Sequence, residues 1–174
     1  DYQGKSAGAV SAFKIQPQTG KLTFLNQKSS GGSAPCHVTV DRSGRTLFVA
    51  NYFGGSIASY RIQSDGSVSD PVTFVQHTGK GTDPQRQEGP HAHAIYPDPN
   101  NRFAVVADLG LDRLIVYRFN SESNRLTAHD APLADWVSGA GPRHFGFHPN
   151  GRWGYAINEM NSTVTTVAYN QEKG

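Results

Sequence analysis

Residues 143–159 read RHFGFHPNGRWGYAINE, and this stretch is the third occurrence of one pattern in the chain. Residues 36–52 (CHVTVDRSGRTLFVANY) and residues 93–109 (HAIYPDPNNRFAVVADL) align with it without a gap. The three occurrences start 57 and 50 residues apart. A repeat of this length is typical of a fold that is built from similar successive units.

Each unit reads as a set of antiparallel strands. In the third unit, Phe145 and Phe147 alternate with other residues as in a strand, and the turn Asn150-Gly151 leads into a second apolar strand. In the first unit, a third strand is predicted over residues 56–62, and a fourth follows the turn at residues 64–66. Four antiparallel strands per unit is the composition of a β-propeller blade.

The ends of the chain supply incomplete units. Residues 9–15 and 22–27 predict only a third and a fourth strand, and the last unit stops after its third strand at Tyr169. We therefore expect an all-β chain of thirteen strands that forms about three blades of a β-propeller. A β-sandwich is the alternative, but it does not explain why one hairpin pattern recurs. The predicted division is a partial blade at 1–32, blades at 33–86 and 87–139, and a partial blade at 140–174.

Composition agrees with this fold and excludes several classes of function. The 174 residues include 19 Gly and 10 Pro, a content that suits many turns. Sixteen Lys and Arg against 14 Asp and Glu leave a charge of only +2, so we expect no nucleic-acid partner. No apolar stretch approaches the ~20 residues that span a bilayer, so we expect no membrane partner. The single Cys36 excludes an internal disulfide and favours a cytoplasmic location.

The hairpins bring polar residues to one mouth of the propeller channel. The innermost strand of each blade lines the channel, so the start of each first strand and the end of each second strand surround the same mouth. His93, Arg143 and Glu159 are predicted to converge there, with the hairpin turns on the opposite face. An arginine–carboxylate pair that only ties two strands together is the alternative. Two-residue turns predict the cross-strand pairs Cys36–Asn51, His93–Asp108 and Arg143–Asn158.

Four motifs surround these residues: QEGPHAH at 87–93, GPRH at 141–144, FHPNG at 147–151 and NE at 158–159. Together they resemble the lactonase family of seven-bladed propellers, which includes propeller-type 6-phosphogluconolactonases and fungal carboxy-cis,cis-muconate cyclases. The resemblance runs from about Gly8 to the C-terminus. It implies hydrolysis of a small-molecule sugar lactone, with 6-phosphogluconolactone as the first candidate.

The resemblance also implies an active site formed by His93, Arg143 and Glu159, with His91 as a neighbour. Arg143 would stabilise an oxyanion or bind an anionic group, and either Glu159 or His93 would take a proton from water. Lys80, Arg86 or Arg143 would hold the phosphate of the substrate. No cofactor is implied. A muconate-lactonising cyclase and a propeller that only binds a partner remain as alternatives.

The resemblance further predicts that the site is completed elsewhere, because the family takes another arginine from a later blade. We therefore expect the chain alone to lack full activity and to associate with itself or with the missing blades. An open propeller leaves an apolar blade face and free strand edges, which favour such association.

The remaining candidates receive structural interpretations. His91 and His93 are two apart on a predicted strand, but no third metal ligand accompanies them, so no metal site is predicted. His37 and His144 occupy equivalent repeat positions and are predicted to pack between blades. Cys36 is also assigned to packing. Trp153 is predicted to lie in the core and Trp136 to reach the rim of the channel.

Overall fold

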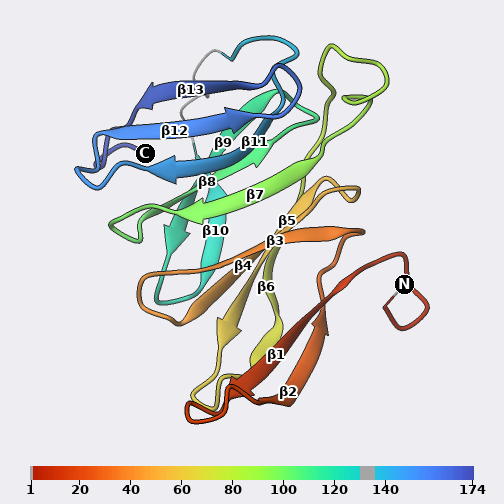
Figure 1. Ribbon diagram of the computed structural model, residues 1–174, viewed down its shortest axis with the longest axis vertical. Helices are drawn as coiled ribbons and strands as arrows, with labels where there is room; N and C mark the ends of the chain where they lie inside the picture. The colour runs from red at the N-terminus through yellow and green to blue at the C-terminus, as the bar shows by residue number, and fades with distance from the viewer. Residues whose placement is uncertain (1, 130–135) are drawn as a thin grey trace.

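The computed structural model describes residues 2–129 and 136–174, and all regular secondary structure in these residues is β (Figure 1). The prediction of an all-β chain of thirteen strands is confirmed for the described part. The strands are β1 (Ala9–Ile15), β2 (Leu22–Ser29), β3 (Pro35–Val40), β4 (Thr46–Asn51), β5 (Ser56–Ile62), β6 (Val68–Gln76), β7 (Ala92–Pro97), β8 (Phe103–Asp108), β9 (Arg113–Asn120), β10 (Arg125–Ala128), β11 (Pro142–Phe147), β12 (Trp153–Asn158) and β13 (Thr163–Ala168).

The strands form four antiparallel sheets in chain order, and each sheet is one blade or part of one. The sheets are β1-β2, β3-β4-β5-β6, β7-β8-β9-β10 and β11-β12-β13. They follow one another along the long axis, from the N-terminal hairpin to the C-terminal sheet (Figure 1). In each of the last three sheets the first strand in the sequence, β3, β7 or β11, is the inner strand. β7 contacts both β3 and β11, so the three inner strands lie side by side along the channel.

A β-bulge at the start of every inner strand corrects the predicted pairing. Pro142, not Arg143, lies opposite Asn158, and the next pair is His144 with Ile157. The same shift occurs between Pro35 and His37 and between Ala92 and Ala94. The predicted pairs of Arg143 with Asn158, His93 with Asp108 and Cys36 with Asn51 are therefore wrong. A bulge leaves one extra residue out of the ladder and turns its side chain in a new direction. The extra residues are Cys36, His93 and Arg143.

The hairpin turns lie at the other end of these strands and depend on buried carboxylates. Asp98 is fully buried, and its Oδ1 accepts the backbone N–H groups of Arg102 (2.7 Å) and Phe103 (2.9 Å). Asp41 does the same in the preceding blade for Arg45 and Thr46. Each turn closes through a residue with positive φ, as the turn geometry requires. These residues are Gly44, Asn101 and Gly151.

The hydrophobic core lies between successive blades. One cluster joins the second and third sheets and includes Phe48, Ile57 and Ile95, which are fully buried. A second cluster joins the third and fourth sheets around Phe145, and Trp136 packs against it. Trp136, which could reach the rim by its position in the sequence, is thus partly buried against this core.

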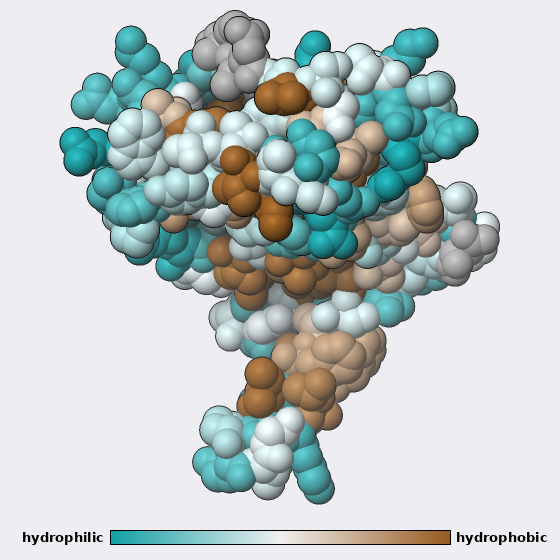
Figure 2. All heavy atoms as spheres, turned by 45° about the horizontal axis from the view of Figure 1, so that its top comes forward, coloured by the Kyte–Doolittle hydropathy of each residue, from teal (hydrophilic) through white to brown (hydrophobic). Residues whose placement is uncertain are grey.

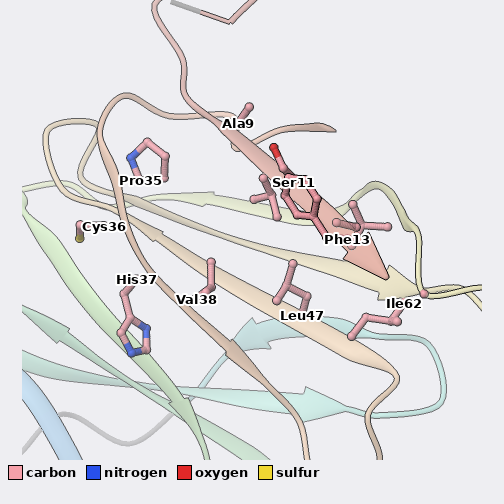
Figure 3. Close-up of a pocket in the computed structure, with 13 residues that line it drawn as sticks. Ala9, Ser11, Phe13, Pro35, Cys36, His37, Val38, Leu47 and Ile62 are labelled. Carbon is pink, nitrogen blue, oxygen red and sulfur yellow. The ribbon is translucent and has the colours of Figure 1, made fainter. Parts of the chain in front are cut away.

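Apolar side chains that no blade covers remain exposed at both ends of the array. Trp153 is 43% exposed, whereas the equivalent residues of the two preceding blades are buried, so its predicted core position is wrong for this chain. Figure 2 shows apolar surface around the narrow end that carries the N-terminal hairpin. A pocket opens there between β1 and β3, lined by Phe13, Val38 and Leu47 among others (Figure 3). Among the described residues there is no helix with the length and apolar character needed to cross a membrane.

Candidate functional site

Glu159 lies between two arginines at the mouth of the channel. Its Oε2 is 2.7 Å from Nε of Arg143, and its Oε1 is 2.5 Å from Nη2 of Arg86. Arg143 is the extra residue of the β11 bulge, Glu159 directly follows β12, and Arg86 comes from the long connection between β6 and β7. The backbone N–H of Glu159 donates to the carbonyl of Gly141, which fixes the carboxylate beside the bulge.

The two guanidinium groups decide the ionisation of Glu159. Burial alone would raise the pKa of Glu159, but the hydrogen bond from Arg86 and the charges of Arg86 and Arg143 hold it below its usual value. Hydrogen bonds to Tyr52 and Glu159 raise the pKa of Arg86. Because both carboxylate oxygens of Glu159 are engaged, Glu159 is suited to hold the arginines in place and is a weak base.

His93 lies at the same mouth but is uncharged, in contrast to the ionised Glu159. It is 8% exposed, and its buried Nδ1 atom has no hydrogen-bond partner among the described residues. Burial and the charge of Arg143 lower the pKa of His93, so the imidazole is neutral at pH 7. The ring contacts Tyr52 edge-on at a centroid distance of 5.5 Å. Because Nδ1 is buried, a bound molecule can transfer a proton to this neutral imidazole only at Nε2.

His91 and Lys80 do not join this group. His91 is 6% exposed and stacks on Tyr52 with ring centroids 4.6 Å apart. Its Nδ1 lies 3.1 Å from the carbonyl of Tyr52 and its Nε2 lies 3.3 Å from Glu88. Lys80 is exposed on the same connection as Arg86. His91 thus forms part of the wall, and the structure brings together Arg86, His93, Arg143 and Glu159.

The loop that carries Arg86 is organised by the fully buried amide of Gln87. Oε1 of Gln87 accepts the backbone N–H groups of Thr82 and Asp83, both at 3.0 Å. Its Nε2 donates to the carbonyl of Leu109 at 2.9 Å. The carboxylate of Asp83 in turn accepts the backbone N–H of Arg86. These hydrogen bonds fix the loop backbone from which the exposed Arg86 side chain extends.

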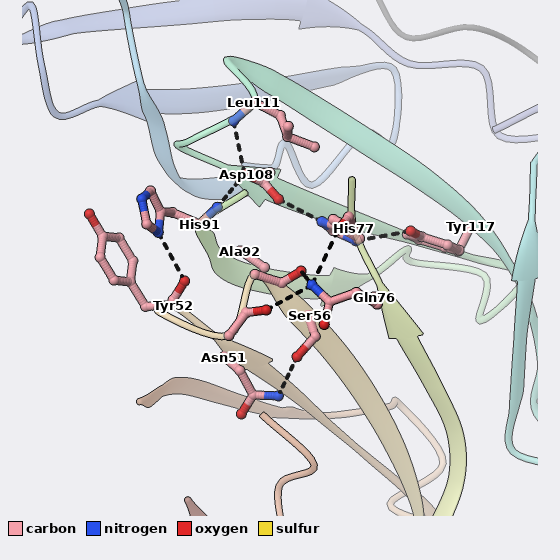
Figure 4. A network of polar contacts seen from close by, with 12 residues as sticks. Asn51, Tyr52, Ser56, Gln76, His77, His91, Ala92, Asp108, Leu111 and Tyr117 are labelled. Atoms are coloured by element: carbon pink, nitrogen blue, oxygen red, sulfur yellow. Dashed lines mark hydrogen bonds and ion pairs between the residues drawn. The ribbon is translucent and has the colours of Figure 1, made fainter. Parts of the chain in front are cut away.

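A buried polar chain supports the segment that begins β7 (Figure 4). Asp108 accepts the backbone N–H of His91 at 2.8 Å through Oδ1 and contacts Nδ1 of His77 at 2.5 Å through Oδ2. The hydroxyl of Tyr117 is 2.9 Å from Nε2 of His77, and burial together with the Asp108 charge raises the pKa of Tyr117 to about 12. This network of polar contacts links two blades directly beneath the residues that lead to His93.

Tyr52 and Cys36 are neighbours of the site that the repeat alignment could have identified, because they align with residues of the site. Tyr52 and Glu159 occupy equivalent repeat positions, so their shared location could have been read from the alignment. Cys36 occupies the position equivalent to His93 and Arg143, and its thiol donates to the carbonyl of His93 at 3.2 Å. Burial raises the pKa of Cys36, and the thiol ties β3 to β7.

The arrangement is suited to an anionic or carbonyl-bearing ligand and a proton transfer. Arg143 and Arg86 offer guanidinium donors, and His93 offers a neutral base. Among the described residues, no group of three or more His, Cys, Asp or Glu side chains is arranged to hold a metal ion.

Sequence comparison decides the family. The profile of the family described as Lactonase, 7-bladed beta-propeller matches residues 2–174. The chain belongs to this lactonase family. The family assignment agrees with the fold, because the described strands form successive propeller blades.

Relatives and solved structures of this lactonase family cover nearly all of the chain. A 6-phosphogluconolactonase of Bacillus subtilis is 38% identical over 96% of this chain and 46% of its own length. A 6-phosphogluconolactonase of Formosa agariphila is 32% identical over 97% of this chain and 48% of its own length. The structure of the periplasmic gluconolactonase of Pseudomonas aeruginosa superposes with a TM-score of 0.89 at 29% identity, over 99% of this chain and 48% of that one. The chain thus spans about half the length of these relatives.

Proposed function

We propose that the natural gene product hydrolyses a sugar lactone, with 6-phosphogluconolactone as the first substrate to test. The observation that carries this proposal is the carboxylate of Glu159 held between Arg86 and Arg143 beside the neutral His93. The two relatives named 6-phosphogluconolactonase support the substrate class.

In the proposed reaction, water attacks the lactone carbonyl and the ring C–O bond breaks. His93 takes the proton of the attacking water, and the ring oxygen leaves with a proton as a hydroxyl group. The carbonyl oxygen becomes negative in the tetrahedral intermediate. Arg143 uses Nε for Glu159, so its terminal amino groups remain to donate to this oxygen in the proposed reaction. Glu159 remains ionised and holds both arginines in place.

Arg86 is the proposed partner of the substrate phosphate, and Lys80 lies on the same connection. Arg86 uses N–H groups for Glu159 and Tyr52, and a guanidinium has five N–H donors, so it still presents donors to a phosphate.

The test is the rate of acid release from 6-phosphogluconolactone by the purified natural gene product. We expect His93→Asn, Arg143→Ala and Glu159→Gln each to lower kcat/KM by about 100-fold or more, with unchanged circular dichroism. Arg152→Ala, an arginine on the turn face, is the control and should leave the rate unchanged. A folded protein without turnover on any sugar lactone would contradict the proposal. Turnover of cis,cis-muconate instead would identify a cyclase.

A further inference from the structure

Three rings meet inside the channel below the mouth. The ring centroids of His37 and His144 are 5.8 Å apart, and Tyr96 contacts both, 4.8 Å from the His37 ring and with its hydroxyl 3.0 Å from Nδ1 of His144. β3 and β11 lie on opposite sides of the β7 sheet, so side chains from these strands can meet only across the inner edge of β7. The equivalent residue of the middle blade, Ala94, has only a methyl group and leaves this space open. The two histidines predicted to pack between blades therefore face the channel.

The hydrogen bonds fix the tautomer of His37. Its Nδ1 accepts the backbone N–H of Ile95 at 3.3 Å, and the ring points from β3 toward β7 (Figure 3). Burial and the nearby His144 and His93 lower the pKa of His37 to about 4. The imidazole is therefore neutral at pH 7, and its one proton is on Nε2.

The same holds for His144. The backbone of Phe145 hydrogen-bonds to the hydroxyl oxygen of Tyr96, so the Tyr96 proton is directed at Nδ1 of His144. Burial and the charge of Arg143 lower the pKa of His144. His144 is thus neutral as well, with its proton on Nε2.

The two Nε2–H groups have no acceptor in the described part of the chain, and neither atom is enclosed. The buried His77 and His91 differ, because both ring nitrogens of each are engaged. His144 also lies directly against His93, with ring centroids 5.1 Å apart. Two unused neutral donors therefore lie next to the proposed base.

We propose that His37 and His144 form a hydroxyl-binding subsite, in which their Nε2–H groups donate to the hydroxyl oxygens of a sugar acid or its lactone. The subsite rests on the proposed function and adds a specificity for polyhydroxylated substrates. Neutral donors suit neutral oxygens, whereas the charged arginines at the mouth suit the acidic group. The substrate thus lies with its carbonyl or carboxylate end at Arg143, any phosphate at Arg86, and its hydroxyl groups toward the two imidazoles.

The test is calorimetric binding of gluconate and of hexanoate, which has the same carboxylate and chain length but no hydroxyl groups. We expect the natural gene product to bind gluconate more tightly than hexanoate. His37→Phe and His144→Phe keep a ring but remove the donor, so each should weaken gluconate binding by about tenfold and leave hexanoate binding unchanged. The Gln variants retain an N–H donor and should recover part of the affinity. His148→Phe, on the turn face, is the control.

The outcomes separate the subsite from the reaction. Equal binding of the two ligands by the natural protein, or equal losses for both ligands in the Phe variants, would overturn the subsite even if lactones are hydrolysed. Preferential gluconate binding that depends on both histidines, without lactone turnover, would support the subsite and contradict the hydrolase. Circular dichroism and the melting temperature of each variant show whether a loss of binding reflects unfolding.

Discussion

Arg86 and Glu159 are 73 positions apart in the chain and are joined by an ion pair of 2.5 Å between Nη2 and Oε1. The pair connects the loop before β7 with the end of β12, so it closes the mouth across two blades. Both side chains are partly exposed, at 45% and 31%, and an exposed pair adds little to stability by itself. Its importance therefore lies in placing a guanidinium at the mouth.

Replacing Arg86 should weaken the recognition of a phosphorylated substrate. In Arg86→Ala, the phosphate loses a charged hydrogen-bonding partner, so KM for 6-phosphogluconolactone should rise by about tenfold or more. The KM for unphosphorylated gluconolactone should change less, because it has no phosphate. Steady-state kinetics on both lactones measures the difference. Equal effects on the two substrates would show that Arg86 does not bind the phosphate.

Gln87 should act on the same step through Arg86. Gln87→Leu removes the buried amide that holds the backbone of Thr82 and Asp83, so the loop that carries Arg86 loses its fixed conformation. The KM for the phosphorylated lactone should rise by a factor similar to that in Arg86→Ala. The double variant Arg86→Ala/Gln87→Leu should have the same KM as Arg86→Ala alone, because both changes remove the same interaction between Arg86 and the phosphate.

Gln85→Leu is the matched control for this series, because Gln85 is an exposed residue of the same loop. Its kinetics should equal those of the natural protein. Additive losses in the double variant would mean that Gln87 affects the site independently of Arg86.

The repeats made the strands predictable, whereas the bulges were not. A hairpin register follows from the turn and the alternation of side chains, which is why the pair of Phe145 with Ala156 follows from the turn at Asn150-Gly151. That reasoning assumes that every residue has one cross-strand partner. Cys36, His93 and Arg143 have no cross-strand partner, and no glycine marks these bulges in the sequence. The site residues are thus at the points where regular pairing ends.

The other features that the sequence did not predict depend on what surrounds a residue rather than on its own strand. Trp153 begins the strand at the predicted place, but its burial depends on whether another blade covers that sheet face. Arg86 reaches Glu159 because the buried Gln87 shapes a loop that has no repeat equivalent. The meeting of His37 with His144 required Ala94 between them, a relation visible only once the three inner strands are placed side by side.

Stability should fall as the pH is lowered, because of His37. Its pKa in the folded chain is about 4, below the value of 6.5 for a free imidazole, so the unfolded chain binds the proton more readily. The free energy of unfolding should therefore decrease as the pH falls from 6.5 and level off for this group below pH 4.

The measurement is urea unfolding across this pH range for the natural protein, for His37→Gln and for the control His148→Gln. His37→Gln removes the titrating ring, so its stability should depend less on pH than that of the other two proteins. The same slope in all three would show that His37 protonates as easily in the folded chain as in the unfolded one.

The buried carboxylate of the middle hairpin should be the most sensitive position of the turn face. Asp98→Ala leaves the backbone N–H groups of Arg102 and Phe103 without their acceptor in a fully buried position, so the free energy of unfolding should fall by about 2 kcal/mol. Asp65 provides a matched comparison, since it also accepts a backbone N–H in a turn, from Ser67, but is exposed. Asp65→Ala should cost much less, because water can replace the lost acceptor. Urea unfolding of both variants measures the contrast, and equal losses would mean that the burial of Asp98 does not govern the stability of its turn.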